Sequence, residues 1–391
     1  MVLRVSYLMI LMGELRGKMA YIASSYNVEH DGISVYLENI LYELAQLDCI
    51  AIDVYVKKSV KDKLMTRIGK NSNLSGINFI GLSKSLLLNI LLLNYYINIK
   101  RYVLVFSPSL TPVLSIRNPS MKVIHDVTYK VFSKSLSLLQ RVYKSLLFWL
   151  LNFDNYYGYI SDATLNQIKK YTRLTKSKKP LILLSNGIPF KTKEHFKDLS
   201  DEVEKKFNNS DLTFLFVGSM NYHKGLDIAV EFVRLVSLRT KNKIILNIAG
   251  KQTDQGIEII NNYKKAINFE LNVYGYISDM DLYKLYAKSK YILCFSHSEG
   301  FGLPIVEASS FKVFPLLSDL PVFKDLTSNS LFYYSHDKKN MSEFIDNYLS
   351  IKGNFYENQY TKIQLDMIDR YLKMYSLSAD KIYNILAKIK Q

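Results

Sequence analysis

Short apolar runs alternate with helical patterns of polar and apolar residues along the whole chain. This alternation is typical of parallel sheets with crossover helices. In the first half of the chain the expected strands are Met19–Ala23, Ile50–Val56, Ile77–Ile80, Tyr102–Ser107, Lys122–His125 and Tyr156–Ile160. In the second half they are Leu212–Val217, Lys243–Ala249, Leu271–Tyr274, Tyr291–Phe295, Val313–Leu317 and Leu331–Tyr333. The pattern predicts an α/β protein with two doubly wound parallel sheets.

The boundary between the two expected domains lies near residue 190. The chain has 391 residues, of which 48% are hydrophobic, and single cores usually stop growing well before this length. A turn-rich segment, Asn186–Pro189, precedes the polar run Lys191–Glu202, which is a combination suited to a linker. We therefore predict a first domain over residues 1–190 and a second over residues 191–371.

Residues 1–18 do not fit the alternating pattern, because the first expected strand begins at Met19. We expect that Met19 is the native start and that the preceding residues are an upstream extension. They carry one charge before Glu14 and no small-residue cleavage site, so a signal peptide is not expected. N-terminal sequencing of the native protein tests this hypothesis, and a start at Met1 would contradict it.

The first half of the chain is the basic one. The formal net charge is +16, and residues 1–190 hold 24 Lys and Arg against 11 Asp and Glu, whereas residues 191–391 hold 27 against 24. Such a surface attracts phosphate on nucleic acid, on an anionic membrane or on a polyanionic substrate. For any single lysine, general solubility charge is an equally good explanation.

The cysteines and the longest apolar stretch indicate the compartment. Cys49 and Cys294 are the two cysteines, each within an apolar run, so no disulfide framework is expected and a reducing cytoplasm fits. The stretch Leu86–Ile99 is interrupted by three asparagines, and it is too short to cross about 30 Å of hydrocarbon as a helix. We predict a cytoplasmic protein without a transmembrane span.

The most informative segment covers residues 296–308 and reads Ser-His-Ser-Glu-Gly-Phe-Gly-Leu-Pro-Ile-Val-Glu-Ala, directly after an expected buried strand. Pro304 suits a first helical turn, so the segment predicts a strand, a glycine loop and a helix start. The glycines allow a close approach of the backbone, and free N–H groups at a helix start suit a phosphate or a sugar hydroxyl. Glu299 and Glu307 place a carboxylate at each end of this site.

This segment resembles the retaining glycosyltransferases of family 4, which have the GT-B fold. The resemblance rests on the Glu-x7-Glu signature from Glu299 to Glu307, with Gly-Phe-Gly-Leu-Pro between the acids. It implies two Rossmann-like domains that face a central cleft, with a C-terminal helix near 372–391 that packs back on the first domain. It also implies a UDP- or GDP-linked sugar as donor substrate and no cofactor. A strand-to-helix turn with an incidental pair of glutamates is the alternative interpretation.

The resemblance assigns roles to residues of the second half. In this family the first glutamate contacts the donor sugar near the reacting carbon and the second holds the ribose hydroxyls, which implies these roles for Glu299 and Glu307. The loop residues between them that are expected to contact the donor are Phe301, Gly302 and Leu303. The segment Leu271–Ser278 is similar to the one whose backbone meets the nucleobase, and it contributes Ile277.

A second strand that runs into a glycine loop covers residues 216–227 and contains Gly218, Ser219 and Lys224. A lysine here can place positive charge on a leaving diphosphate, where negative charge grows as the glycosidic bond breaks. The loop resembles the Lys-Gly motif of the family, which makes Lys224 the diphosphate ligand. The family often has Arg at the position of Ser219, so one cation is missing here. A lysine that is solvated or complements a helix end is the alternative for Lys224.

The first half holds two weaker matches. Asp31-Gly32-Ile33-Ser34 is similar to the Gly-Gly loop of the family, and the amides of Gly32 and Ile33 are the expected phosphate contacts. A helix N-cap is an equally good role for Asp31. His125 ends an expected strand, as does the family histidine that approaches the donor sugar across the cleft. By sequence alone, a histidine at a strand end is more often a structural hydrogen-bonding group.

No metal site is expected. Asp279-Met-Asp281 matches the Asp-x-Asp of metal-dependent glycosyltransferases, but it follows Ser278 and opens a helical pattern. Carboxylates in a first helical turn are favoured by the helix dipole. The histidines and cysteines show no His-x3-His or Cys-x2-Cys spacing, which would be typical of metal sites, and retaining enzymes of this fold generally need no metal.

The segment Ser133–Phe153 is first basic and then strongly apolar and aromatic. It is a candidate for peripheral contact with an anionic membrane, as basic amphipathic helices are. We favour a buried core helix, because the apolar run Leu146–Leu151 shows little sidedness.

Taken together, these features predict a metal-independent retaining glycosyltransferase with a glycan or lipid-linked acceptor in the synthesis of a cell-surface polysaccharide such as lipopolysaccharide. An epimerase or a phosphorylase of the same fold is the alternative among enzymes. A nucleic-acid-binding protein is disfavoured, because the basic residues are scattered without an interleaved aromatic motif.

Overall fold

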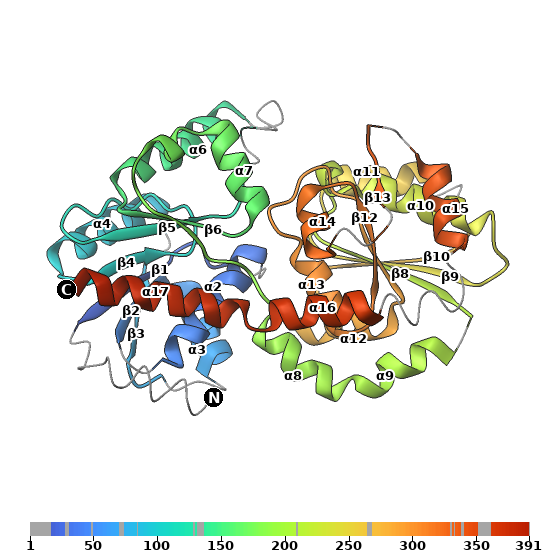
Figure 1. Cartoon of the computed structure of the whole chain (residues 1–391), viewed down its shortest axis with the longest axis horizontal. Helices are drawn as coiled ribbons and strands as arrows, with labels where there is room; N and C mark the ends of the chain where they lie inside the picture. Colours follow the sequence, from blue (N-terminus) through green and yellow to red (C-terminus); the bar gives the residue numbers. More distant parts are fainter. Residues whose placement is uncertain are drawn as a thin grey trace. The chain divides into compact units, whose positions relative to one another are not determined.

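A computed structural model describes residues 17–27, 31–47, 50–69, 74–83, 85–127, 130, 137–208, 210–263, 268–328, 331, 333–337, 340–350 and 361–390. Residues 1–16 of the expected extension, Cys49 and residues 133–136 lie outside this part of the chain. The chain forms two compact units (Figure 1): residues 1–185 together with 374–391, and residues 186–373. It therefore passes from one unit to the other at two points.

The first unit contains a parallel sheet of seven strands in the described residues, in the order β3-β2-β1-β4-β5-β6-β7. The strands are β1 Lys18–Ala23, β2 Ala51–Lys57, β3 Ile77–Leu82, β4 Leu104–Ser107, β5 Ser120–Ile124, β6 Tyr156–Tyr159 and β7 Leu181–Leu183. β1 lies in the interior of the sheet, where Met19 pairs with Ile52 on one side and Leu104 on the other. Residues Met19–Ala23 are fully buried, as expected for a strand covered on both faces.

The sheet of the first unit is flanked by α2 Gly32–Ala45, α3 Lys61–Gly69, α4 Leu86–Ile99, α6 Leu138–Leu150, α7 Asp162–Tyr171 and α17 Met374–Lys390. Asp31 caps α2, because its carboxylate accepts the Ser34 amide at 2.9 Å. The last helix, α17, packs beside α2 (Figure 1) and is tied to β7 through Lys381, which donates to the Leu183 carbonyl at 2.9 Å. The end of the chain thus belongs to the first unit.

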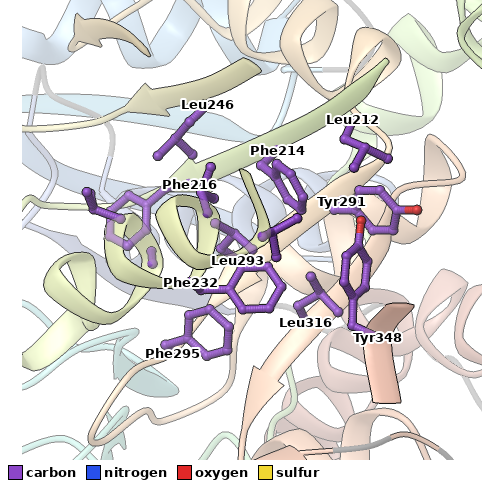
Figure 2. Packing of buried hydrophobic residues seen from close by; sticks show 14 of the residues in the cluster. Leu212, Phe214, Phe216, Phe232, Leu246, Tyr291, Leu293, Phe295, Leu316 and Tyr348 are labelled. Atoms are coloured by element: carbon purple, nitrogen blue, oxygen red, sulfur yellow. The ribbon is translucent and has the colours of Figure 1, made fainter. Parts of the chain in front are cut away.

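The second unit contains a six-stranded parallel sheet in its described part, in the order β10-β9-β8-β11-β12-β13. Its strands are β8 Leu212–Val217, β9 Ile244–Ala249, β10 Glu270–Gly275, β11 Tyr291–Cys294, β12 Phe314–Ser318 and β13 Tyr333–Tyr334. The helices are α8 Phe190–Asp198, α9 Ser200–Lys205, α10 Leu226–Ser237, α11 Asp254–Tyr263, α12 Asp279–Lys288, α13 Leu303–Ser310, α14 Pro321–Leu326, α15 Met341–Ser350 and α16 Thr361–Leu372. Figure 2 shows the aromatic core, in which Phe214 of β8 stacks on Tyr291 at 5.2 Å and meets Phe232 edge-on at 5.9 Å.

The expected α/β fold with two parallel sheets is confirmed, and each expected strand overlaps an observed one. The sequence pattern missed β7, which is three residues long and only partly buried. It follows Lys178-Lys179-Pro180, and a proline beside so short an apolar run argues against a strand unless the strand lies at a sheet edge. β7 is such an edge strand.

The favoured interpretation of α6 as a buried core helix is wrong. Within α6, Leu147 is the buried residue, while Leu139 is 82% and Trp149 is 56% exposed. The run 146–151 is too short to show which side of the helix is apolar. The apolar side becomes visible only when the residues toward the N-terminus of the helix are included. Its solvent-exposed apolar residues, with Phe153 just beyond, are Leu138, Leu139, Val142, Tyr143, Leu146, Trp149 and Phe153. Among the described helices, none combines the length and the apolar character needed to cross a bilayer.

Each sheet contains one point at which the strand order reverses. In the first unit the order reverses between β1 and β4, and in the second between β8 and β11. The loops that follow two such strands diverge to opposite faces of the sheet, which leaves a crevice at the carboxyl ends of the strands where ligands commonly bind. We therefore expect functional side chains at the carboxyl ends of these strands.

Candidate functional site

The loops that follow β8 and β11 meet through their backbones. The His297 amide donates to the His223 carbonyl at 2.9 Å. Gly225, with φ of +73°, lies so close to the other loop that a Cβ atom would stand 2.0 Å from the Phe295 carbonyl oxygen. A residue with a side chain fits here neither sterically nor in backbone conformation. Glycine at 225 thus allows the two loops to share one edge of the sheet.

This contact brings Lys224 and Glu299 together, although 75 positions separate them in sequence. The Lys224 ammonium donates to Oε2 of Glu299 at 2.6 Å. The two side chains are 28% and 21% exposed, respectively. The pair is therefore accessible to a ligand, and a phosphate group could compete with Glu299 for the lysine.

The glycine loop after Glu299 leads into α13. Gly302 has φ of +97°, and its Cα packs against Phe323, Leu326 and Ile305, whose atoms would lie 3.0–3.1 Å from a Cβ. Phe301 is buried and meets Tyr371 edge-on at 5.6 Å. Leu303 begins the helix, with proline at the following position. The loop thus turns at Gly302, where α13 begins. Pro304 has no N–H group, and the Ile305 amide donates to the Gly302 carbonyl at 3.0 Å, so the candidate ligand donors at this helix start are the amides up to Leu303.

Glu307 lies one turn into α13 and is 7% exposed. Its Oε2 accepts a hydrogen bond from the Tyr286 hydroxyl at 3.0 Å. Burial, and then the nearby Glu307 carboxylate, hold the pKa of Tyr286 well above its usual value, so the hydroxyl remains a donor. The partner on α12 was missed by sequence reasoning, because nothing in a local pattern relates Tyr286 to an acid 21 positions away.

The other residues of this unit that are expected to bind the sugar donor lie in loops at the carboxyl ends of the strands. Gly218 has φ of +147°, and the space on the side where a Cβ would point is open. The Ser219 hydroxyl accepts from the Asn221 side chain at 3.0 Å. Ile277 follows β10, which β9 separates from β8, and it is partly buried.

The Asp-x-Asp segment lies in the first turn of α12, which Ser278 caps. Asp279 lies 3.6 Å from Lys191, and Asp281 accepts from the Ser278 hydroxyl at 2.7 Å. In the part of the chain that the structure describes, no group of three or more His, Cys, Asp or Glu side chains is arranged to hold a metal ion.

Gly32, Ile33 and His125 belong to the first unit. Gly32 begins α2, and its Cα faces open space. His125 follows β5, and its Nε2 lies 2.7 Å from the Pro108 carbonyl, which requires the proton on Nε2. Its ring meets Tyr36 edge-on at 4.8 Å. Burial lowers the pKa of His125 although the Pro108 carbonyl opposes this shift, so the imidazole is neutral near pH 7 and Nδ1 is an acceptor.

Comparison with known protein families shows which family this chain is related to. The sequence profile "Glycosyl transferases group 1" matches residues 199–363, a range that contains Lys224, Glu299 and Glu307. Residues 199–363 of the chain thus carry the domain of this family. The expected family and the expected class of fold are both confirmed.

Relatives of established identity match parts of the chain or nearly all of it. The serotype-specific mannosyltransferase WbdA of Escherichia coli is 32% identical over 126 residues, which are 32% of this chain and 15% of WbdA. A GDP-mannose:cellobiosyl-diphosphopolyprenol alpha-mannosyltransferase of Komagataeibacter xylinus is 28% identical over 37% of this chain and 35% of its own. The O-antigen biosynthesis glycosyltransferase WclY of E. coli is 24% identical over 84% of this chain and 87% of its own. The chain thus spans a small part of WbdA and most of WclY.

Solved structures show the same two-unit fold. The crystal structure of Anabaena Alr3699/HepE in complex with UDP and glucose has a TM-score of 0.68 and 13% sequence identity, over 94% of this chain and all of that one. The similarity covers both units, so the chain has a fold of the GT-B type.

Proposed function

We propose that this chain is a retaining glycosyltransferase that moves a hexose from a nucleotide-diphosphate sugar to a glycan or lipid-linked acceptor in cell-surface polysaccharide synthesis. The observation that supports it most is the Lys224–Glu299 contact of 2.6 Å at the point where strand order reverses. A cation for a diphosphate and a carboxylate for the sugar attached to it are then adjacent. Glu307, eight positions after Glu299, adds a second, rigidly held carboxylate.

In this proposal the leaving group is stabilised by Lys224 and by the amides of Phe301, Gly302 and Leu303. Negative charge grows on the diphosphate as the glycosidic bond breaks, so fixed cations and N–H donors lower the barrier. Glu299 contacts the sugar near its reacting carbon, and Glu307 accepts hydrogen bonds from the ribose hydroxyls. Gly218, Ser219 and Ile277 complete the donor site, with Ile277 next to the base.

The first unit contributes the other residues of the proposed reaction. The amides of Gly32 and Ile33 contact phosphate, and His125 contacts the donor sugar through Nδ1, since Nε2 is held by Pro108. The acceptor hydroxyl attacks from the face that the diphosphate leaves, so the anomeric configuration is retained. No metal and no cofactor take part.

The relatives suggest which donor to test first. WbdA and the Komagataeibacter enzyme are mannosyltransferases, so GDP-mannose is the first choice, and UDP-glucose is the second because HepE was crystallised with UDP and glucose. We expect one nucleotide sugar in a panel to raise the unfolding temperature of the protein in a concentration-dependent way. Absence of any shift with GDP- and UDP-sugars would contradict the proposal.

Product analysis separates the transferase from an epimerase of the same fold. With the stabilising donor and a polyprenyl-diphosphate glycan as acceptor, a transferase forms a new glycosidic product and one nucleoside diphosphate for each sugar moved. An epimerase would isomerise the donor or release nucleotide without any acceptor. The choice of a lipid-linked acceptor follows from the Komagataeibacter relative, whose name gives cellobiosyl-diphosphopolyprenol as its acceptor.

We further propose that α6 touches the inner face of the cytoplasmic membrane. Its exposed apolar residues are accompanied by the exposed cations Arg141 and Lys144, and such a combination favours an anionic bilayer surface. The Lys179 ammonium donates to the peptide carbonyl of Asn152 at 2.5 Å. This contact places a third cation at the residue that precedes Phe153. An acceptor anchored in the membrane would then be within reach of a protein bound at the surface.

Vesicle flotation tests this contact. The protein is expected to float with vesicles that contain phosphatidylglycerol and less with neutral ones, and Leu139→Asp together with Val142→Asp should abolish flotation. Leu238→Asp, at a 64% exposed leucine of the second unit, is the matched control and should float like the wild type. Equal flotation of all variants, or none at low salt, would refute the membrane contact.

A further inference from the structure

Three aromatic rings from separate loops form a column in the second unit. The Tyr222 ring stacks on His297 with centroids 4.7 Å apart and planes inclined by 20°. On its other face His297 stacks on His336, at 4.0 Å and 25°. Tyr222 precedes α10, His297 follows β11 and His336 follows β13. The column therefore joins loops from three parts of the sheet edge.

One end of the column is anchored in the hydrophobic core. His336 meets Tyr334 edge-on at 5.2 Å, and Tyr334 is 7% exposed and packs edge-on against Phe295 at 5.7 Å. The His336 Nε2 also lies 3.1 Å from the Ser296 carbonyl. At the other end, Tyr222 is 51% exposed. His297 is thus held between a fixed ring and a ring that borders solvent.

Two rings of the column are close in sequence to the members of the charged pair. Tyr222 stands two positions before Lys224, and His297 stands two positions before Glu299. We propose that His297 is a positioning residue, whose ring between Tyr222 and His336 sets the separation of the Lys224 ammonium and the Glu299 carboxylate. This inference rests on the proposed transferase function, in which Lys224 must reach the diphosphate while Glu299 reaches the sugar.

The surroundings of His297 indicate that its flat, uncharged face is what matters. Its Nε2 is buried and has no hydrogen-bond partner among the described residues. Burial, and then the neighbouring His336 and His223, lower the pKa of His297 to about 4. The ring is therefore neutral over the pH range in which the enzyme would work, and it acts by stacking. A phenyl ring can replace it, whereas a methyl group cannot.

The test compares His297→Ala with His297→Phe in the full chain. Binding of GDP and UDP is measured by calorimetry, and transfer is measured with the donor that stabilises the wild type. We expect His297→Ala to lower kcat/KM by about tenfold to a hundredfold, since an error near 1 Å in placing a reacting group costs this much. His297→Phe should restore most of the loss. His195→Ala, which removes another histidine packed on a tyrosine ring at 5.3 Å, should behave like the wild type.

A double-mutant cycle shows whether His297 acts through the lysine. If it does, His297→Ala should have little further effect in a Lys224→Ala background, because the group that it positions is gone. Full additivity, or equal losses in His297→Phe and His297→Ala, would overturn the positioning role while leaving the transferase proposal intact. A wild type that binds neither nucleotide and transfers no sugar would instead refute the proposed function itself.

Discussion

Replacing Lys224 by alanine is expected to lower the rate of sugar transfer by about a hundredfold or more, which is the usual cost of losing one preorganised charge partner of a transition state. The Lys224 ammonium contacts Glu299 at 2.6 Å, and its side chain is 28% exposed. When the donor is bound, the same cation would meet the diphosphate. The loss should appear mainly in kcat, because the charge on the diphosphate grows as the bond breaks.

The unfolding temperature shows whether Lys224→Ala loses activity without losing its fold. A partly exposed ion pair contributes about 1 kcal/mol or less to stability, so Lys224→Ala should unfold at nearly the temperature of the wild type. Lys284→Ala removes a lysine from the exposed pair with Asp281, at 3.7 Å, and serves as the matched control with wild-type transfer. Glu299→Gln should be impaired as strongly as Lys224→Ala. Wild-type turnover in either site variant would disprove the assigned roles.

Gly225→Ala is expected to destabilise the second unit by about 3 kcal/mol or more, a cost reached when overpacking combines with strain at a special backbone conformation. A Cβ at this position would stand 2.0 Å from the Phe295 carbonyl oxygen and 2.5 Å from its carbon, both of them backbone atoms. The φ of +73° adds strain for any residue with a side chain. The loop that carries Lys224 must therefore move away from the loop that carries Glu299.

Chemical denaturation of the two variants at one pH measures this effect. Gly32→Ala is the control, since no atom lies within 4 Å of its Cβ position and the residue is in a helix. Alanine is favoured over glycine in helices by about 1 kcal/mol, so this variant should be no less stable than the wild type. If Gly225→Ala is as stable as the wild type, the close approach of the two loops is not a feature of the folded protein.

Much of the architecture could be read from local patterns. Buried parallel strands are short, apolar and bounded by turns, so their positions follow from the order of residues within a few neighbours. β7 was missed because so short an edge strand buries little and leaves no pattern. The interpretation of α6 failed for a related reason, since a helix rich in apolar residues does not reveal whether another element covers it.

Part of the candidate site could also be predicted from the sequence, and part of it could not. The Glu299–Glu307 segment is continuous, so its strand, glycine turn and helix start are visible in the sequence alone. The contact between Lys224 and Glu299 is not, because it depends on β8 and β11 being neighbours in the sheet. The same holds for the hydrogen bond from Tyr286 to Glu307.

By itself, the sequence determined which short segments are strands, where glycine loops open helices and which family the chain resembles, because these are properties of neighbouring residues. Tertiary structure alone decided that Gly225 lies against Phe295, that Tyr222 and His336 stack on His297 and that α6 keeps its apolar side exposed. The physical reason is that packing and ion pairing depend on distances in space, and strand order sets these distances between residues far apart in the chain.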